Sequence, residues 1–197
     1  MSTPLWILLA IGLLVFFWAV GAYNRLVRLK NAIANAFGQI DVQLKRRYDL
    51  IPNLVEVARQ YLAHEAETLE AVIAARNQAR TAEQSAAASP LNADALGALA
   101  GAEQMLGSTL GRLFALAEAY PDLKADQTMR ELSEELASTE NRIGFARQAY
   151  NDHVLEFNDA AAQFPTVILA RLFTFVPQSM LASTTSEAER APVKVAF

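Results

Sequence analysis

The sequence predicts an all-α protein: an N-terminal transmembrane helix followed by an antiparallel, up-and-down four-helix bundle with long helices. Two observations predict this fold. An uncharged, apolar run stands near the N-terminus, and the remaining chain carries apolar residues at helical spacing, without the alternation that marks half-buried strands. Long amphipathic helices without strands pack as a bundle.

The uncharged run, residues 5–22, is long enough to cross a membrane. At about 1.5 Å per residue it spans about 27 Å as a helix, close to the hydrocarbon thickness of a bilayer. Trp18 and Tyr23 stand at one end, where amphipathic rings favour the headgroup layer. We therefore expect a short flank, residues 1–4, and a membrane anchor, residues 5–23, that contacts lipid through Leu5, Trp6, Ile7, Leu8, Leu9, Leu13, Leu14, Val15, Phe16, Phe17 and Trp18.

A cleaved secretory signal is the alternative for this run. The small residues Ala19, Val20 and Gly21 resemble a cleavage site. However, no basic residue precedes the run, and its apolar part is longer than the usual 7 to 15 or so residues. The sequence therefore favours an anchor that is retained.

Basic residues on one side of the run predict its orientation. Arg25, Arg28 and Lys30 follow the run at once, whereas no basic side chain precedes it. Because positive charge is retained on the cytoplasmic side, we expect the N-terminus outside and the bundle in the cytoplasm.

Charge and cysteine content narrow the possible function. Residues 1–47 carry a net charge of +5 and residues 48–197 a net charge of −9, for a total of −4. An acidic body without a basic, aromatic face gives no reason to expect nucleic-acid binding. The chain has no cysteine, which excludes disulfides and thiolate metal sites.

The bundle, residues 24–163, should contain helices at about 24–48, 50–80, 93–119 and 126–163. Pro52 should end the first helix in a turn, because proline lacks an amide hydrogen and disfavours helix at Ile51. A kink in one longer helix is the alternative. Steps of three and four define the inward stripes, which include Leu26, Ile33, Phe37, Ile40 and Leu44 in the first helix.

The later helices show the same spacing. The third contains Leu96, Leu99, Glu103, Leu106, Leu110 and Leu113 in one stripe, and the fourth contains Met129, Leu136, Ile143, Tyr150, Val154 and Phe157. Asn92 or Asp94 can cap the third helix. Between the second and third helices, residues 81–93 are small and polar and contain Pro90, which predicts a mobile loop.

An apolar segment, residues 164–181, follows the bundle with Arg171 as its only charge. If the chain turns at Pro52, this segment returns to the membrane-proximal end; if Pro52 only kinks the helix, it finishes far from lipid. Core packing over the bundle end, lipid contact and self-association remain open for Val167, Ile168, Leu172, Phe173 and Phe175. The clustered Ser, Thr, Glu and Pro residues of positions 182–197 predict a disordered tail.

No catalytic or metal-binding pattern stands out, so we expect no cofactor. The pair His64-Glu65 lacks the second histidine of a zinc helix, because Thr68 occupies that position. Lys45-Arg46-Arg47 should complement the dipole at the end of the first helix. Polar residues on the fourth helix should fix helix register through partners on neighbouring helices; they are Glu140, Asn141, Arg142, Arg147, Tyr150 and Asn151.

Four stretches together resemble the LemA family of bacterial membrane proteins. They are residues 35–55 (NAFGQIDVQLKRRYDLIPNLV), His64-Glu65 before Thr68-Leu69-Glu70-Ala71, residues 117–124 (AEAYPDLK), and residues 132–151. The resemblance covers about residues 5–177 and leaves the tail outside. It implies one N-terminal anchor, a helical bundle, a bacterial inner-membrane location and no established enzymatic activity.

The sequence and the resemblance together predict a non-enzymatic, membrane-anchored helical scaffold. The resemblance suggests an HtpX-type membrane protease or a TPM-domain protein as partner, and associates one branch of the family with magnetosome membranes. A homo-oligomer remains open. The alternative is a membrane-remodelling or membrane-sensing protein that uses residues 164–181.

Overall fold

The computed structural model describes residues 3–181, apart from the side chains of residues 3 and 5, and within this range every regular element is a helix. The all-α prediction is therefore confirmed. The predictions for the side chain of Leu5 and for the tail, residues 182–197, lie outside the described residues. The helices are α1 (Thr3–Tyr61), α2 (Ala66–Ala88), α3 (Ala93–Ala117), α4 (Pro121–Ala125), α5 (Gln127–Ala162) and α6 (Thr166–Leu172).

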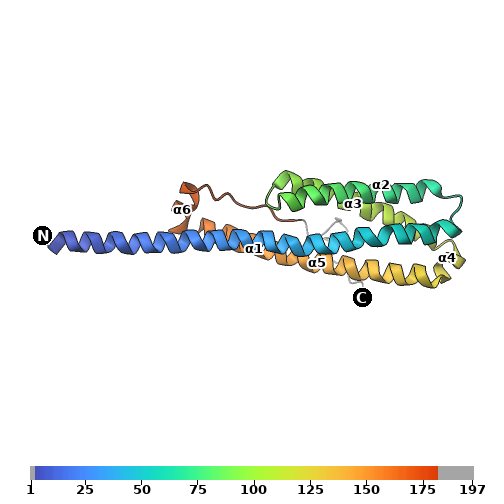
Figure 1. Ribbon diagram of the computed structural model, residues 1–197, viewed down its shortest axis with the longest axis horizontal. Coiled ribbons are helices and arrows are strands. Elements are labelled where there is room, and N and C mark those ends of the chain that lie inside the picture. The colour runs from blue at the N-terminus through green and yellow to red at the C-terminus, as the bar shows by residue number, and fades with distance from the viewer. Residues whose placement is uncertain (1–2, 182–197) are drawn as a thin grey trace, which may run out of the picture.

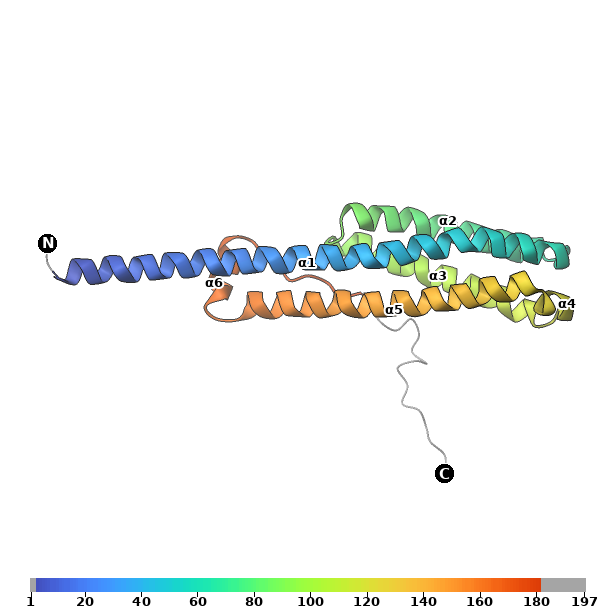
Figure 2. The same ribbon diagram turned by 60° about the horizontal axis from the view of Figure 1, so that its bottom comes forward.

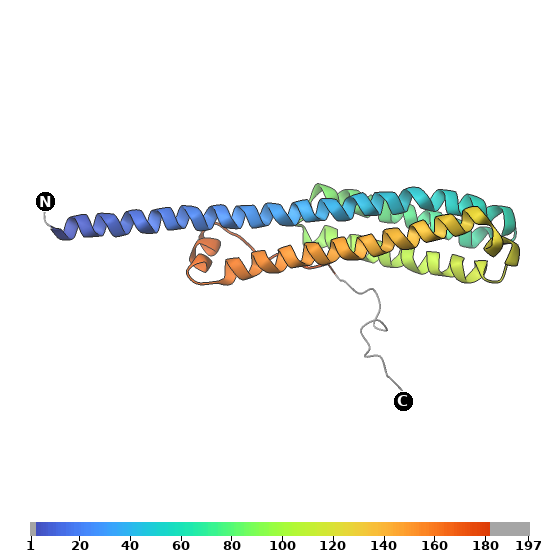
Figure 3. The ribbon, with the colours of Figure 1, turned by 90° about the horizontal axis from the view of Figure 1, so that it is seen from below.

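The four long helices lie side by side and alternate in direction (Figures 1 and 2). The helix α1 runs from the N-terminus to the distal end of the molecule, α2 returns beside it, α3 runs outward again, and α5 returns along α1. Residues 6–23 of α1, which we call the apolar arm, extend beyond the other long helices (Figure 3). The helix α6 lies against α1 near this arm.

One hydrophobic core joins the four long helices, and it contains the inward stripes that the sequence predicts. The largest fully buried side chains come from α1, α3 and α5 and from the turn after α1; they include Phe37, Tyr48, Leu106, Tyr150, Phe157 and Leu62. The arm makes no contribution to this core, since none of the residues in its apolar window is buried.

The predicted turn at Pro52 is wrong, because α1 continues through it to Tyr61. Pro52 cannot donate to the carbonyl oxygen of Tyr48, one turn earlier, and this oxygen would otherwise remain unpaired in the core. Instead, Nε of Arg76 on α2 donates to it at 2.9 Å. The missing helical hydrogen bond is thus replaced by one between helices, and the chain turns only at residues 62–65.

The predicted loop at residues 81–93 is also mostly helical. The helix α2 continues to Ala88, so the connection shrinks to residues 89–92. Alanine-rich sequence has high helix propensity, and Ala79, Glu83 and Ala86 form a narrow buried stripe despite their small or polar side chains. An apolar period of large residues is therefore not needed here.

The starts of α3 and α5 are capped by side chains. The side chain of Asn92 accepts hydrogen bonds from the amides of Asp94 and Ala95 at the start of α3. Asp126 accepts from the amide of Met129 at the start of α5. Both helices therefore begin within a residue or two of their predicted starts, and the short α4 between them was not expected from the sequence.

Replacing Arg76 with methionine should lower the free energy of unfolding by about 1–3 kcal/mol, because the buried carbonyl oxygen of Tyr48 loses its donor. In a Pro52→Ala background the loss should be smaller, since the new amide at residue 52 can bind that oxygen. Thermal unfolding of the full chain in detergent, followed by circular dichroism, measures both differences. An equal loss in the two backgrounds would contradict the replacement of one bond by the other.

Candidate functional site

The exposed apolar arm is the first candidate functional feature, because it could contact a membrane. Large apolar side chains along it are exposed, among them Trp6, Ile7, Leu8, Leu9, Leu13, Leu14, Val15, Phe16, Phe17 and Trp18. This part of α1 is long and apolar enough to cross a membrane. The topology-determining residues that the sequence predicts, Arg25, Arg28 and Lys30, are exposed just beyond the arm. One apolar N-terminal helix is thus compatible with a membrane anchor.

The helix α6 packs against the end of this arm that adjoins the bundle. The rings of Tyr23 and Phe173 meet edge to face with centroids 4.9 Å apart, and Phe175 lies 5.6 Å from Tyr23. A groove of about 370 Å³ separates the two helices, and its lining is apolar: Phe16, Ala19, Val20, Tyr23, Leu169, Leu172 and Phe173. Residues 164–181 therefore lie beside the arm although α1 passes through Pro52, so the expectation that an unbroken helix would leave them far from the anchor is wrong; the chain reverses at residues 62–65 instead and makes the same number of passes.

The five residues that we singled out in this segment do not share one environment. Ile168, Leu172 and Phe173 are exposed, Val167 is half-buried, and Phe175 packs against the core. The rings of Phe175 and Phe157 lie 6.3 Å apart. Core packing thus accounts for part of the segment and leaves its outer face apolar and uncovered within the described chain.

After α6 the chain reverses and runs back along α5. Amides of Thr174 and Phe175 donate to the carbonyl oxygens of Arg171 and Ala170, which is the pattern of a Schellman motif, and Thr174 adopts the left-handed conformation (φ 58°) that this motif requires. The reversal places Phe175 beside both Tyr23 and Phe157.

Two asparagines on α5 bind the backbone of the segment that follows α6, residues 175–181. Asn158 donates to the carbonyl oxygen of Gln178 at 3.0 Å and accepts from the amide of Gln178 at 2.8 Å. Asn151 binds both backbone groups of Leu181 in the same way, at 2.7 and 2.8 Å. The seven helical steps from Asn151 to Asn158 and the three extended steps from Gln178 to Leu181 both rise about 10 Å, so both asparagines can bind their backbone partners at once.

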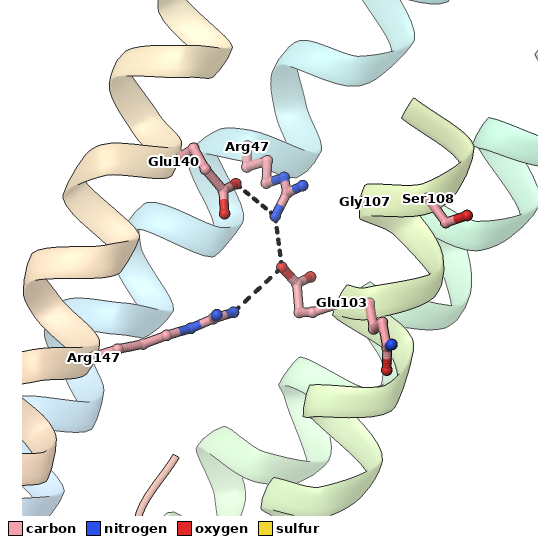
Figure 4. A pocket seen from close by; sticks show the side chains of 7 residues that line it. Arg47, Glu103, Gly107, Ser108, Glu140 and Arg147 are labelled. Atoms are coloured by element: carbon pink, nitrogen blue, oxygen red, sulfur yellow. Dashed lines mark hydrogen bonds and ion pairs between the residues drawn. The ribbon is translucent and has the colours of Figure 1, made fainter. Parts of the chain in front are cut away.

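A charged network lies in the middle of the bundle (Figure 4). Nη1 of Arg47 on α1 lies 2.8 Å from Glu103 on α3 and 2.9 Å from Glu140 on α5. Nη2 of Arg147 on α5 lies 3.9 Å from the same oxygen of Glu103. The hydroxyl of Tyr48 donates to the other oxygen of Glu103 at 2.6 Å. These bonds join three helices, and Arg47 and Glu103 are buried.

Few polar groups of this network are left without a partner. Burial, with the nearby charge of Glu103, raises the pKa of Tyr48, so its hydroxyl stays protonated and donates. A cavity of about 280 Å³ adjoins the network and is lined by Arg47, Glu103, Gln104, Gly107, Ser108, Glu140 and Arg147. The charged groups of this cavity are paired with one another across the helices (Figure 4).

A second polar cluster joins α1 to α2. Nζ of Lys45 lies 2.6 Å from Asp41 and 3.6 Å from Glu83, which is almost fully buried. Burial, followed by hydrogen bonding to Asp41 and its negative charge, raises the pKa of Glu83 to about 7. Burial alone would raise the pKa of Asp41, but hydrogen bonds with Glu83 and Lys45 lower it on balance.

The expected role of Lys45-Arg46-Arg47 at a helix end is wrong, because these residues lie in the middle of α1. Their partners are Asp41, Glu83, Glu103, Glu135 and Glu140. On α5, Glu140 and Arg147 join the network and Asn151 binds the backbone of Leu181, whereas Asn141 and Arg142 are exposed.

Three important residues were missed as candidates. Glu103 already stood as the single charge in an apolar stripe, and this signal could have identified a buried partner for a base. Glu83 and Asn158 gave no such signal, because their roles depend on contacts with distant parts of the chain.

Among the described residues no group of three potential metal ligands comes together, and His64 is exposed in the turn after α1.

Replacing Glu103 with alanine should lower the free energy of unfolding by about 3–5 kcal/mol, because it leaves Arg47 buried with only Glu140 as a close partner. The matched control is Glu135→Ala, which breaks the exposed pair with Arg46 and should cost about 1 kcal/mol or less. Chemical unfolding of the full chain in detergent measures both. Equal effects would show that the buried network carries no special energetic weight.

The buried carboxyl of Glu83 should make stability fall as pH rises. The folded state keeps its proton up to about pH 7, whereas the unfolded chain releases it near pH 4.5, so the stabilisation present below pH 4.5 is lost through pH 7. Relative to Glu83→Gln, the wild type should lose up to about 3 kcal/mol over this range. Unfolding at graded pH tests this, with Glu70→Gln on the exposed face of α2 as control. A constant difference between wild type and Glu83→Gln would contradict it.

Comparison with known proteins identifies the family. Protein LemA from Metamycoplasma hominis is 28% identical over 167 residues, which are 85% of this chain and 71% of that protein. Magnetosome protein MamQ from Magnetospirillum gryphiswaldense is 33% identical over 78 residues, 40% of this chain. MamQ 2 from Paramagnetospirillum magneticum gives the same identity and coverage. The matched region spans only 29% of either MamQ protein.

The sequence model of the LemA family matches residues 36–197. This match includes the tail that we had expected to lie outside the resemblance, and it begins after the arm. It covers well over half of the sequence, and this protein therefore belongs to the LemA family.

Proposed function

We propose that the protein is a non-enzymatic scaffold, which is anchored in the bacterial inner membrane by the apolar arm and presents its helical bundle to partner proteins. The observation that carries this proposal is the continuity of α1, which is one helix from the arm to the distal end. A bundle built on such a helix is held at a fixed place and in a fixed direction relative to its anchor.

The internal chemistry supports a structural role. In the charged network next to the cavity, Arg47 and Tyr48 both bind Glu103, and Arg147 pairs with the same carboxylate. The body of the protein is acidic, which suits partners with basic surfaces. The family resemblance offers HtpX-type membrane proteases and TPM-domain proteins as candidates.

The exposed basic residues after the arm favour the orientation with the N-terminus outside and the bundle in the cytoplasm.

A second candidate function is membrane sensing or remodelling. It is favoured by a separate observation, namely the packing of α6 against residues 16–23 of the arm.

Photocrosslinking in membranes tests the scaffold proposal. Phe145 on α5 is 73% exposed, whereas Phe157 on the same helix is fully buried. A photoreactive benzoylphenylalanine at position 145 should yield discrete crosslinked proteins, and the same residue at position 157 should yield only products within the chain. Mass spectrometry identifies the attached proteins.

The scaffold proposal would be overturned by either of two results. One is a set of exposed bundle positions that capture no other protein in intact membranes. The other is a specific hydrolase activity of the purified chain that is lost in Glu140→Gln.

A further inference from the structure

We infer that residues 164–176, with α6 at their centre, lie in the membrane leaflet next to the bundle, where lipid covers their outer face. This inference deepens the second candidate function and rests on the proposal that the apolar arm crosses a membrane. The ligand it assigns is phospholipid: acyl chains for the apolar side chains and a phosphate for Arg171.

The depth of α6 follows from its contacts with the arm. The groove between the helices is lined from Phe16 to Tyr23, which is about 10 Å along the axis of α1. Tyr23 stands at the headgroup end of the arm, and Phe173 packs on its ring. The helix α6 thus occupies about the outer 10 Å of one leaflet, the depth at which amphipathic interfacial helices lie.

No placement of the membrane plane keeps α6 in water while the arm still spans the bilayer. To exclude the groove from lipid, the membrane surface would have to cross α1 before Phe16. Residues 6–15 of the arm would then remain in lipid, and as a helix they cover about 15 Å, half of the hydrocarbon thickness of about 30 Å. A spanning arm therefore takes α6 into the leaflet with it.

The outer face of the segment has the chemistry of a lipid-facing surface. Large apolar side chains of the segment are exposed to between 52% and 82%, namely Phe164, Ile168, Leu172, Phe173 and Val176, of which Leu172 and Phe173 also line the groove. Soluble surfaces rarely gather so many apolar side chains in one short segment. Arg171 is also exposed, and a long basic side chain at this depth can reach the phosphate layer.

The fold fixes the depth of the segment. After it in the chain, Asn158 and Asn151 on α5 bind the backbone of Gln178 and Leu181. Within it, the ring of Phe175 packs against the rings of Tyr23 on α1 and Phe157 on α5. Because the segment is held on both α1 and α5, it enters the leaflet as a built part of the bundle rather than as a loose tail.

The absence of cysteine in the chain permits single spin labels in the full-length protein. Ile168→Cys and Leu172→Cys variants, labelled with a nitroxide, are reconstituted into vesicles of phosphatidylcholine and phosphatidylglycerol. The matched controls are Val42→Cys on the bundle, where the native residue is 57% exposed against 59% for Ile168, and Leu14→Cys in the arm, where exposure is 71%, as for Leu172. Collision with oxygen reports lipid, and collision with a water-soluble nickel chelate reports water.

Labels at residues 168 and 172 should give a several-fold higher ratio of oxygen to nickel collisions than the label at residue 42, up to the ratio at residue 14, which lies deeper in the bilayer. A ratio equal to that at residue 42 would place the segment in water and overturn the inference while leaving the anchor intact. Shielding from both reagents would indicate contact with a second copy and would also overturn it. A label at residue 14 that reports water would instead refute the membrane span itself, and the inference with it.

Discussion

The hydrogen bond from Arg76 to the carbonyl oxygen of Tyr48 is the constraint on which the architecture depends. It allows α1 to pass through Pro52 with its backbone polar groups paired, where a proline inside a buried helix would otherwise favour a break. Because α1 does not break, the apolar arm and the bundle share one helix, and the reversal of the chain moves to residues 62–65. The same continuity places Arg47 in the middle of the bundle, within reach of α3 and α5.

Polar contacts join all four long helices at this level of the bundle. Arg76 links α2 to α1, Tyr48 and Arg47 link α1 to α3, and Glu140 links α5 to α1. Apolar stripes with a period of three and four can slide by one turn without losing much burial, whereas paired charges with fixed partners cannot. We therefore attribute the register of the helices to this polar level and most of their cohesion to the apolar core.

Much of the core could be predicted from the sequence, because spacing in steps of three and four is a local property of each helix. Leu26 and Ile33 on α1 and Leu106 on α3 are buried as expected. The continuity at Pro52 could not be predicted, because it depends on Arg76, which lies 24 residues further along the chain. The clamps at Asn151 and Asn158 were out of reach for the same reason, since asparagine binds any backbone and leaves no pattern in its target. Glu103 is different, because one acidic residue within an apolar stripe was visible from the start.

Because α1 is one unbroken helix, a tilt at one end moves the other end sideways. From Tyr23 to Tyr61, α1 extends about 57 Å beyond the arm. Transmembrane helices commonly tilt by about 20° to match the thickness of their bilayer. Over the length of α1 beyond the arm, such a tilt would displace Tyr61 sideways by about 20 Å. If the arm spans a bilayer as proposed, a change in its tilt would therefore move the distal end of the bundle much further than the end at the membrane.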